Sequence, residues 1–208
     1  YEGIFFIVLE KVEHQTLRRV LEHQQLSPET GMDIAKLILE SLSRLDDNEI
    51  YSDLSDGQVF LDFNDSTHEI VTLILGDFGG VSEKGKRVSY QSKAFSRLPD
   101  LYRSPEGVGV ETELYSLAIL VEKVMGVSHS SFLSTTVRSY HISNSDSKAA
   151  DEKRFHKQAW TKLVTFEPNN REIYESLPDW IIGFIEGCKS NNPGLQFKSR
   201  QEALAYLN

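Results

Sequence analysis

The chain has little cysteine and no long apolar run at its start. Cys188 is the only cysteine among 208 residues, so no internal disulfide can form. That excludes a disulfide-stapled scaffold and fits a reducing compartment. The apolar run at residues 4–9 is far too short to span a bilayer and lacks the basic flank of a signal peptide. We therefore expect an intracellular, cytoplasmic protein without membrane insertion.

Positive charge is also scarce. Lysine and arginine number 22 against 31 aspartates and glutamates, which gives a formal net charge of −9. That balance argues against nucleic acid or an anionic membrane as the main partner. Hydrophobic residues make up 39% and charged residues 25%, an ordinary globular composition. The length suits one domain, so we expect residues 1–208 to form a single unit.

Two aspartates flank a predicted β-hairpin. Val59–Phe63 and Ile70–Leu75 are rich in β-branched and aromatic residues, and a polar segment separates them. Asp53 precedes this hairpin and Asp77 follows it, so both are expected at its open end. Two carboxylates at one sheet edge can act as a base and a metal ligand, the pairing that phosphoryl transfer needs.

The segments that carry these aspartates resemble two motifs of one family. Residues 51–58 read Tyr-Ser-Asp-Leu-Ser-Asp-Gly-Gln, and residues 77–79 read Asp-Phe-Gly. In this order they resemble the catalytic loop and the Asp-Phe-Gly segment of eukaryotic protein kinases. The resemblance covers nearly the whole chain. It implies an α+β fold, mainly α-helical: a protein-kinase-like C-lobe with small β-hairpins and a buried central helix.

Apolar periodicity predicts helices where this lobe would have them. Ser27 followed by Pro28 is a strong helix start. The predicted helices lie at residues 16–22, after Ser27, from Glu113 onward, after Pro178 and at residues 201–207. The helix after Pro178 is predicted to turn four residues inward: Ile181, Phe184, Ile185 and Cys188. The Ser-rich residues 128–150 are predicted to form a surface connection.

The resemblance also predicts a hinge near the start of the chain and a long loop after Asp77. Residues 3–10 are predicted to form a buried strand that leads into a hinge, where Glu10 and Val12 would face an adenine. Residues 81–97 are predicted to be a long surface loop in the place of the activation segment. The chain contains no glycine-rich phosphate loop, strand lysine or helix glutamate of a small lobe, which the family carries before the hinge. Truncation of that N-lobe is favoured over its true absence.

The resemblance assigns roles to a few side chains. Asp53 would be the catalytic residue that orients a substrate hydroxyl, and Asp77 would bind Mg²⁺. Gln58 would be a second metal ligand and part of the nucleotide site, where the family has asparagine. ATP and Mg²⁺ are thus the expected cofactors if the nucleotide site functions, and a protein is the expected substrate or partner.

Several positions depart from the family pattern. Ser52 and Ser55 replace the arginine and lysine of the catalytic loop, and Tyr51 replaces a histidine that packs under Phe78. Glu113 stands where an aspartate holds the backbone of that loop.

Near the end of the chain, Gln196 stands where an arginine would pair with Glu106, unless Arg200 substitutes. Two hypotheses follow. One is a catalytically impaired pseudokinase that acts as a protein-interaction or regulatory module. The other is an active Ser/Thr-type protein kinase once its N-lobe is present. A non-kinase phosphotransferase is a more distant third.

Overall fold

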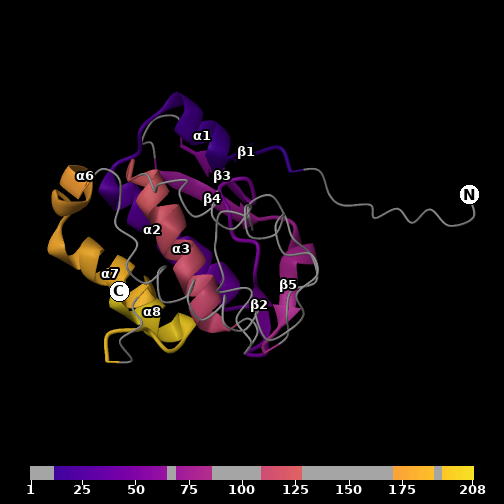
Figure 1. Cartoon of the computed structure of the whole chain (residues 1–208). Coiled ribbons are helices and arrows are strands. Elements are labelled where there is room, and N and C mark those ends of the chain that lie inside the picture. Colours follow the sequence, from indigo (N-terminus) through magenta and orange to yellow (C-terminus); the bar gives the residue numbers. More distant parts are fainter. Residues whose placement is uncertain (1–11, 65–68, 86–108, 128–170, 190–193) are drawn as a thin grey trace, which may run out of the picture.

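The computed structural model describes residues 12–64, 69–85, 109–127, 171–189 and 194–208. In this part the chain is α+β, with helices packed beside two small antiparallel sheets (Figure 1). The elements in chain order are β1 (Gln15–Thr16), α1 (Leu17–His23), α2 (Pro28–Leu42), β2 (Glu49–Tyr51), β3 (Val59–Phe63), β4 (Ile70–Leu75), the 3-10 turn η1 (Phe78–Gly80), β5 (Val81–Glu83), α3 (Val110–Val124), α6 (Arg171–Glu175), α7 (Asp179–Lys189) and α8 (Arg200–Tyr206).

The predicted hairpin is confirmed with its predicted bounds. Strands β3 and β4 pair antiparallel, with Val59 opposite Leu75 at the open end and Phe63 opposite Ile70 near the turn. The short strand β1 adds to the other edge of β3, which gives a sheet in the order β1-β3-β4.

The second sheet corrects a prediction. Residues 81–83 form strand β5, which pairs antiparallel with β2, whereas the sequence predicted a surface loop there. Tyr51 lies opposite Val81 in this pairing. A strand of three residues is too short to show alternation, so only the pairing partner reveals it. Residues 86–97 of the predicted loop lie outside the described residues.

Helices α2 and α3 supply the centre of the core (Figure 1). Helix α2 begins as predicted: the Ser27 hydroxyl accepts a hydrogen bond from the Thr30 amide at 3.2 Å, and Pro28 occupies the first turn. Helix α3 begins at Val110, three residues before the predicted start, and is buried over most of its surface. The prediction of a buried central helix is therefore confirmed.

Helices α7 and α8 close the core from the other side. Helix α7 contacts α3, and α8 contacts α2. The residues predicted to face inward from α7 are all buried: Ile181, Phe184, Ile185 and Cys188. Burial raises the pKa of the Cys188 thiol, so this cysteine behaves as a small core residue and not as a nucleophile.

Other predictions fall on parts of the chain that the structure does not describe. These are the strand at residues 3–10 with Glu10, the anchor at Glu106, and the segment at 128–150. Where the structure does describe helices, none of them is both long and apolar enough to cross a membrane.

Candidate functional site

The open end of the hairpin brings the two predicted metal ligands together. The Gly76 amide donates to the Gln58 carbonyl at 2.8 Å and ties the end of β4 to the residue before β3. Gly76 is needed there, because a Cβ would lie 2.7 Å from the ring of Phe60. One residue later, Asp77 meets Gln58: the Gln58 Nε2 donates to the Asp77 Oδ2 at 3.4 Å. The hairpin predicted Asp77 at this end, together with Asp53, whereas only the resemblance assigned Gln58 as a second metal ligand.

Asp77 itself has a strained backbone. Its φ of 52° and ψ of 61° lie in the left-handed region, and it is the only described non-glycine residue with a positive φ. Aspartate tolerates this conformation better than most residues, but it still carries a cost. Backbone strain of this kind is concentrated at binding and catalytic sites. The left-handed turn directs the chain into η1 and leaves Asp77 exposed.

The chemistry of this pair fits Mg²⁺. The ion takes hard oxygen ligands and is often held by one or two carboxylates, with water and phosphate oxygens completing the octahedron. Asp77 offers a carboxylate, and Gln58 offers an amide oxygen once its side-chain amide turns over. The described residues include no cluster of three or more metal-binding His, Cys, Asp or Glu side chains.

Tyr51 connects this edge to the core. Its ring is fully buried and packs against Phe78, with ring centroids 5.5 Å apart and planes tilted by 56°. Its hydroxyl donates to the Gly76 carbonyl. Tyr51 thus fills the space beneath Phe78, as predicted from the position of the family's histidine. It also links strand β2 to the turn that presents Asp77.

A buried carboxylate holds the backbone of the same strand. The Tyr51 amide donates to Glu113 Oε1 on helix α3 at 2.8 Å. Glutamate therefore makes the backbone contact that the resemblance assigns to the shorter aspartate. Glu113 has no solvent exposure, so this bond is made in a low-dielectric interior where it is strong.

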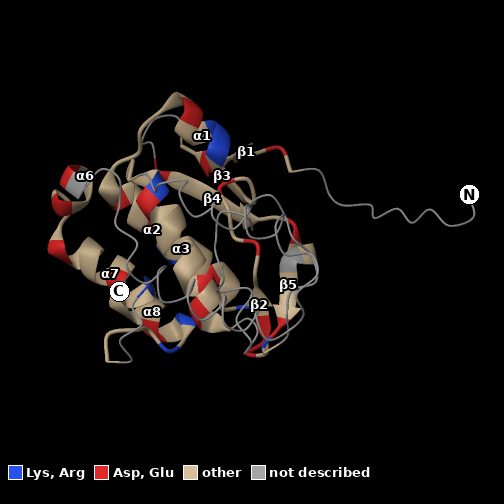
Figure 2. Cartoon of the chain, in the orientation of Figure 1, with Lys and Arg blue, Asp and Glu red and all other residues tan. Residues whose placement is uncertain are grey.

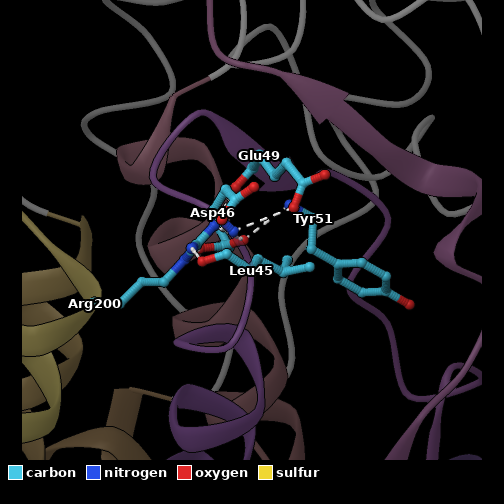
Figure 3. Close-up of polar contacts among 6 residues, drawn as sticks. Leu45, Asp46, Glu49, Tyr51 and Arg200 are labelled. Atoms are coloured by element: carbon cyan, nitrogen blue, oxygen red, sulfur yellow. Dashed lines mark hydrogen bonds and ion pairs between the residues drawn. The ribbon is translucent and has the colours of Figure 1, made fainter.

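Arg200 completes that network from the closing helix α8. Its Nε donates to Glu113 Oε2 at 2.6 Å and its Nη2 to Glu113 Oε1 at 3.1 Å, a two-point ion pair. The guanidinium also donates to the Glu49 carbonyl and, at 3.5 Å, to the Leu45 carbonyl. Figure 3 shows Arg200 reaching from the α8 side toward the Leu45–Glu49 turn and the Tyr51 backbone. One arginine thereby fixes both the turn and the strand that precede Asp53.

Burial and pairing oppose each other at Glu113. Removal from water raises the pKa of Glu113, while the Arg200 guanidinium and the Tyr51 amide act in the opposite direction. This use of Arg200 differs from the predicted alternative, in which it would replace a lost partner of Glu106. The sequence did not indicate the Glu113–Arg200 pair, because 87 residues separate its members.

A second ionic cluster lies on the segment of residues 51–58, and the sequence did not indicate it either. Asp56 accepts from Arg18 Nε at 3.3 Å and Nη2 at 3.2 Å, and from the Lys123 Nζ. Its carbonyl accepts from the Arg18 amide at 2.9 Å. Burial alone would raise the pKa of Asp56, but the hydrogen bonds and charges of Arg18 and Lys123 outweigh it and lower that pKa. The cluster joins α1, the loop and the end of α3.

The remaining predicted residues lie near this cluster in sequence or outside the description. Asp53 is half-buried, three positions before Asp56. The Ser52 hydroxyl, one residue after β2, lies 3.3 Å from the Ser82 hydroxyl of β5. Val12 is half-buried at the start of the described part, and Glu10 is not described. The adenine contact of both stays a prediction.

Comparisons with known proteins leave the family open. No protein-family model matches this chain. A search against curated proteins also finds no match. The likeness to the large lobe of protein kinases therefore rests on the motifs and on the contacts described above, and it stays a prediction.

Proposed function

We propose that this chain is a divergent protein-kinase-like C-lobe, catalytically impaired, that acts as a protein-interaction or regulatory module. The observation that carries this proposal is the contrast between framework and chemistry around residues 51–58. Side chains that position the loop are present and well bonded. Side chains that would handle a transferring phosphate are replaced.

One side of this contrast is the set of contacts that position residues 51–58. Glu113 accepts from the Tyr51 amide at 2.8 Å, and the Tyr51 ring packs against Phe78. Gln58 and Asp77 meet at the open end of the hairpin. These are the relations that the resemblance implies among loop, central helix and Asp-Phe-Gly segment, so they support a kinase-like lobe.

The other side of this contrast is the use of positive charge around residues 51–58. Ser55 stands where a lysine would neutralise the transferring phosphate, and phosphoryl transfer depends on such electrostatic stabilisation. The two cations that the structure places on this loop, Arg18 and Lys123, both donate to Asp56. Asp56 holds them through a nearly buried carboxylate with a lowered pKa, so freeing either cation would cost energy. This arrangement favours a structural over a catalytic use of the loop.

The alternative is an active protein kinase, favoured by one specific observation: Asp77 and Gln58 are in contact and could share a cation. Asp77 and Gln58 would hold Mg²⁺, and the ion would supply positive charge to offset that of the ATP phosphates. Asp53 would accept the proton of the attacking protein hydroxyl. The Tyr51 hydroxyl donates to the Gly76 carbonyl and would thereby hold Asp77 at a fixed position relative to residues 51–58.

The two functions separate in one assay on the longest natural form of the protein. Incorporation of the ATP γ-phosphate into a generic protein substrate is measured with Mg²⁺, for the wild type and for Asp53→Ala. If the chain is an impaired interaction module, the wild type should incorporate no more phosphate than Asp53→Ala does. Transfer that Asp53→Ala abolishes, together with Mg²⁺-dependent thermal stabilisation by ATP that Asp77→Ala removes, would overturn the impaired-lobe proposal and establish the enzyme.

A further inference from the structure

Helix α1 carries a recess that the candidate site does not use. It is an open depression of about 370 Å³ lined by Thr16, Arg18, Arg19, Glu22 and His23. Figure 2 shows basic and acidic segments side by side on α1. Two arginines face one glutamate there, in a chain whose formal net charge is −9. The recess therefore has a local charge opposite in sign to that of the whole protein.

Arg18 is held in place by the loop beneath it. Its Nε and Nη2 donate to Asp56, and a Cβ on Gly57 would lie 3.0 Å from Nη2, so the guanidinium rests directly on the loop backbone. A guanidinium has five N–H groups, and two of them serve Asp56. The Arg18 side chain is still 55% exposed. Its remaining donors are thus pre-organised and available to an outside acceptor, which lowers the entropic cost of binding.

Arg19 provides a second, less constrained cation. Its side chain is exposed, and within the described residues its backbone amide is bonded to Thr16 while the side chain has no bonded partner. His23, one turn further along α1, lines the same recess. Adjacent cations on a short helix suit a carboxylate or a phosphate, which accepts several N–H bonds at once.

We propose that this recess docks an acidic peptide segment of a partner protein, through carboxylate or phosphoryl oxygens bound by Arg18 and Arg19. The inference deepens the proposed interaction module and rests on it. A peptide suits the site better than a polyanion does, because the −9 charge of the chain repels an extended anionic surface whereas the recess attracts one or two anionic side chains. Contact with Arg18 would also place the partner directly above residues 56–57.

The test is fluorescence anisotropy with labelled peptides in the absence of ATP. The probes are a Glu/Asp-rich peptide, the same sequence with phosphoserines in place of the acidic residues, and a Lys-rich peptide as charge control. We expect Arg19-dependent binding of one or both acidic probes, whereas any attraction of the Lys-rich probe to the acidic chain should not depend on Arg19. Comparing the two acidic probes shows whether carboxylate or phosphate is the preferred anion.

Charge-reversal variants then locate the binding. Arg19→Glu should weaken it by roughly tenfold or more, because it removes one cation and repels the ligand. Arg44→Glu makes the same charge change at an exposed arginine outside the recess, and should stay within about twofold of the wild type. Arg19 is chosen over Arg18 because loss of the Asp56 contacts could unfold the loop. Thermal unfolding of both variants verifies that they are folded.

Three outcomes would overturn the inference. One is no binding of either acidic peptide at physiological salt. The second is equal weakening by Arg19→Glu and Arg44→Glu, which would indicate only general charge. The third is Arg19-dependent binding of phosphatidylserine vesicles without peptide binding, which would indicate a lipid surface. Since no ATP is present, the result is independent of whether the domain transfers phosphate.

Discussion

Glu113 and Asp77 are two carboxylates on either side of the same tyrosine, and they are held in very different ways. Glu113 has no solvent exposure and binds Arg200 at two points and the Tyr51 amide at a third. Asp77 is exposed, and its bond from Gln58 is 3.4 Å long. The first is embedded in a full network, whereas the second is presented at an edge by a strained turn.

The buried Glu113 serves the stability of the fold, whereas the exposed Asp77 would serve a reaction. An uncompensated charge in the interior is costly, so every member of the Glu113 network must be kept together for the chain to fold. An exposed carboxylate is solvated by water and can be lost at little cost to stability. A lobe built in this way can retain its shape while the chemistry at its edge is eroded. That is the pattern the proposed module would show.

The largest effect should come from breaking the buried pair. In Glu113→Ala, Arg200 would be left as a buried cation and the Tyr51 amide would lose its acceptor. We expect the free energy of unfolding to fall by about 3–5 kcal/mol. Urea unfolding followed by circular dichroism measures it. A loss below about 1 kcal/mol would contradict the role of this network.

The Asp56 cluster should give an intermediate effect that depends on pH. Asp56→Asn should lower the free energy of unfolding at pH 7 by about 1–2 kcal/mol, because Arg18 and Lys123 are about half exposed and water screens them. The pKa of Asp56 is below its ordinary value of 3.8, so the folded state binds fewer protons than the unfolded state. Its contribution is therefore complete above that value and lost as pH falls through the folded-state pKa.

The measurement for Asp56 is urea unfolding of both proteins from pH 7 down into the acid range. The difference between wild type and Asp56→Asn should shrink as the pH falls. A difference that stayed constant with pH would show that the carboxylate charge is not responsible.

Tyr51→Phe should cost about 1 kcal/mol of unfolding free energy, since it removes the hydroxyl bond to Gly76 and keeps the ring contact with Phe78. Tyr206→Phe is a matched control. It deletes the hydroxyl that donates to the Trp180 carbonyl at 3.1 Å on the exposed side of α8 and should cost less. Equal losses in the two variants would argue against a special role for the buried bond.

The smallest effect on stability belongs to Asp77→Asn, which keeps a residue that tolerates the left-handed backbone. We expect a change below about 0.5 kcal/mol. The same protein should lose any Mg²⁺-dependent binding of ATP, measured by thermal shift. A loss of stability as large as that of Glu113→Ala would remove the contrast between framework and edge.

Local sequence patterns predicted several helices and strands correctly. The hairpin Val59–Phe63 and Ile70–Leu75, the start of α2 at Pro28 and the inward face of α7 all follow from signals within a few residues. The position of Asp77 at the open end also follows, because it comes shortly after the second strand of the hairpin. These features depend on periodicity, caps and turn residues, which a single sequence displays.

The contacts that the sequence did not predict join residues far apart in the chain. The pairing of β2 with β5, the ion pair of Glu113 with Arg200, and the convergence of Arg18 and Lys123 on Asp56 join residues far apart in the chain. A charged residue in the sequence carries no sign of which opposite charge will reach it, since that depends on how helices pack.

The sequence by itself thus determined the α+β class of the fold and the position of Asp77 at the open end of the hairpin. Only the tertiary structure decided which carboxylates are buried in networks and which one is presented to solvent. The physical reason is that burial and ion pairing are properties of the packed core, whereas turns and helix ends are properties of neighbouring residues.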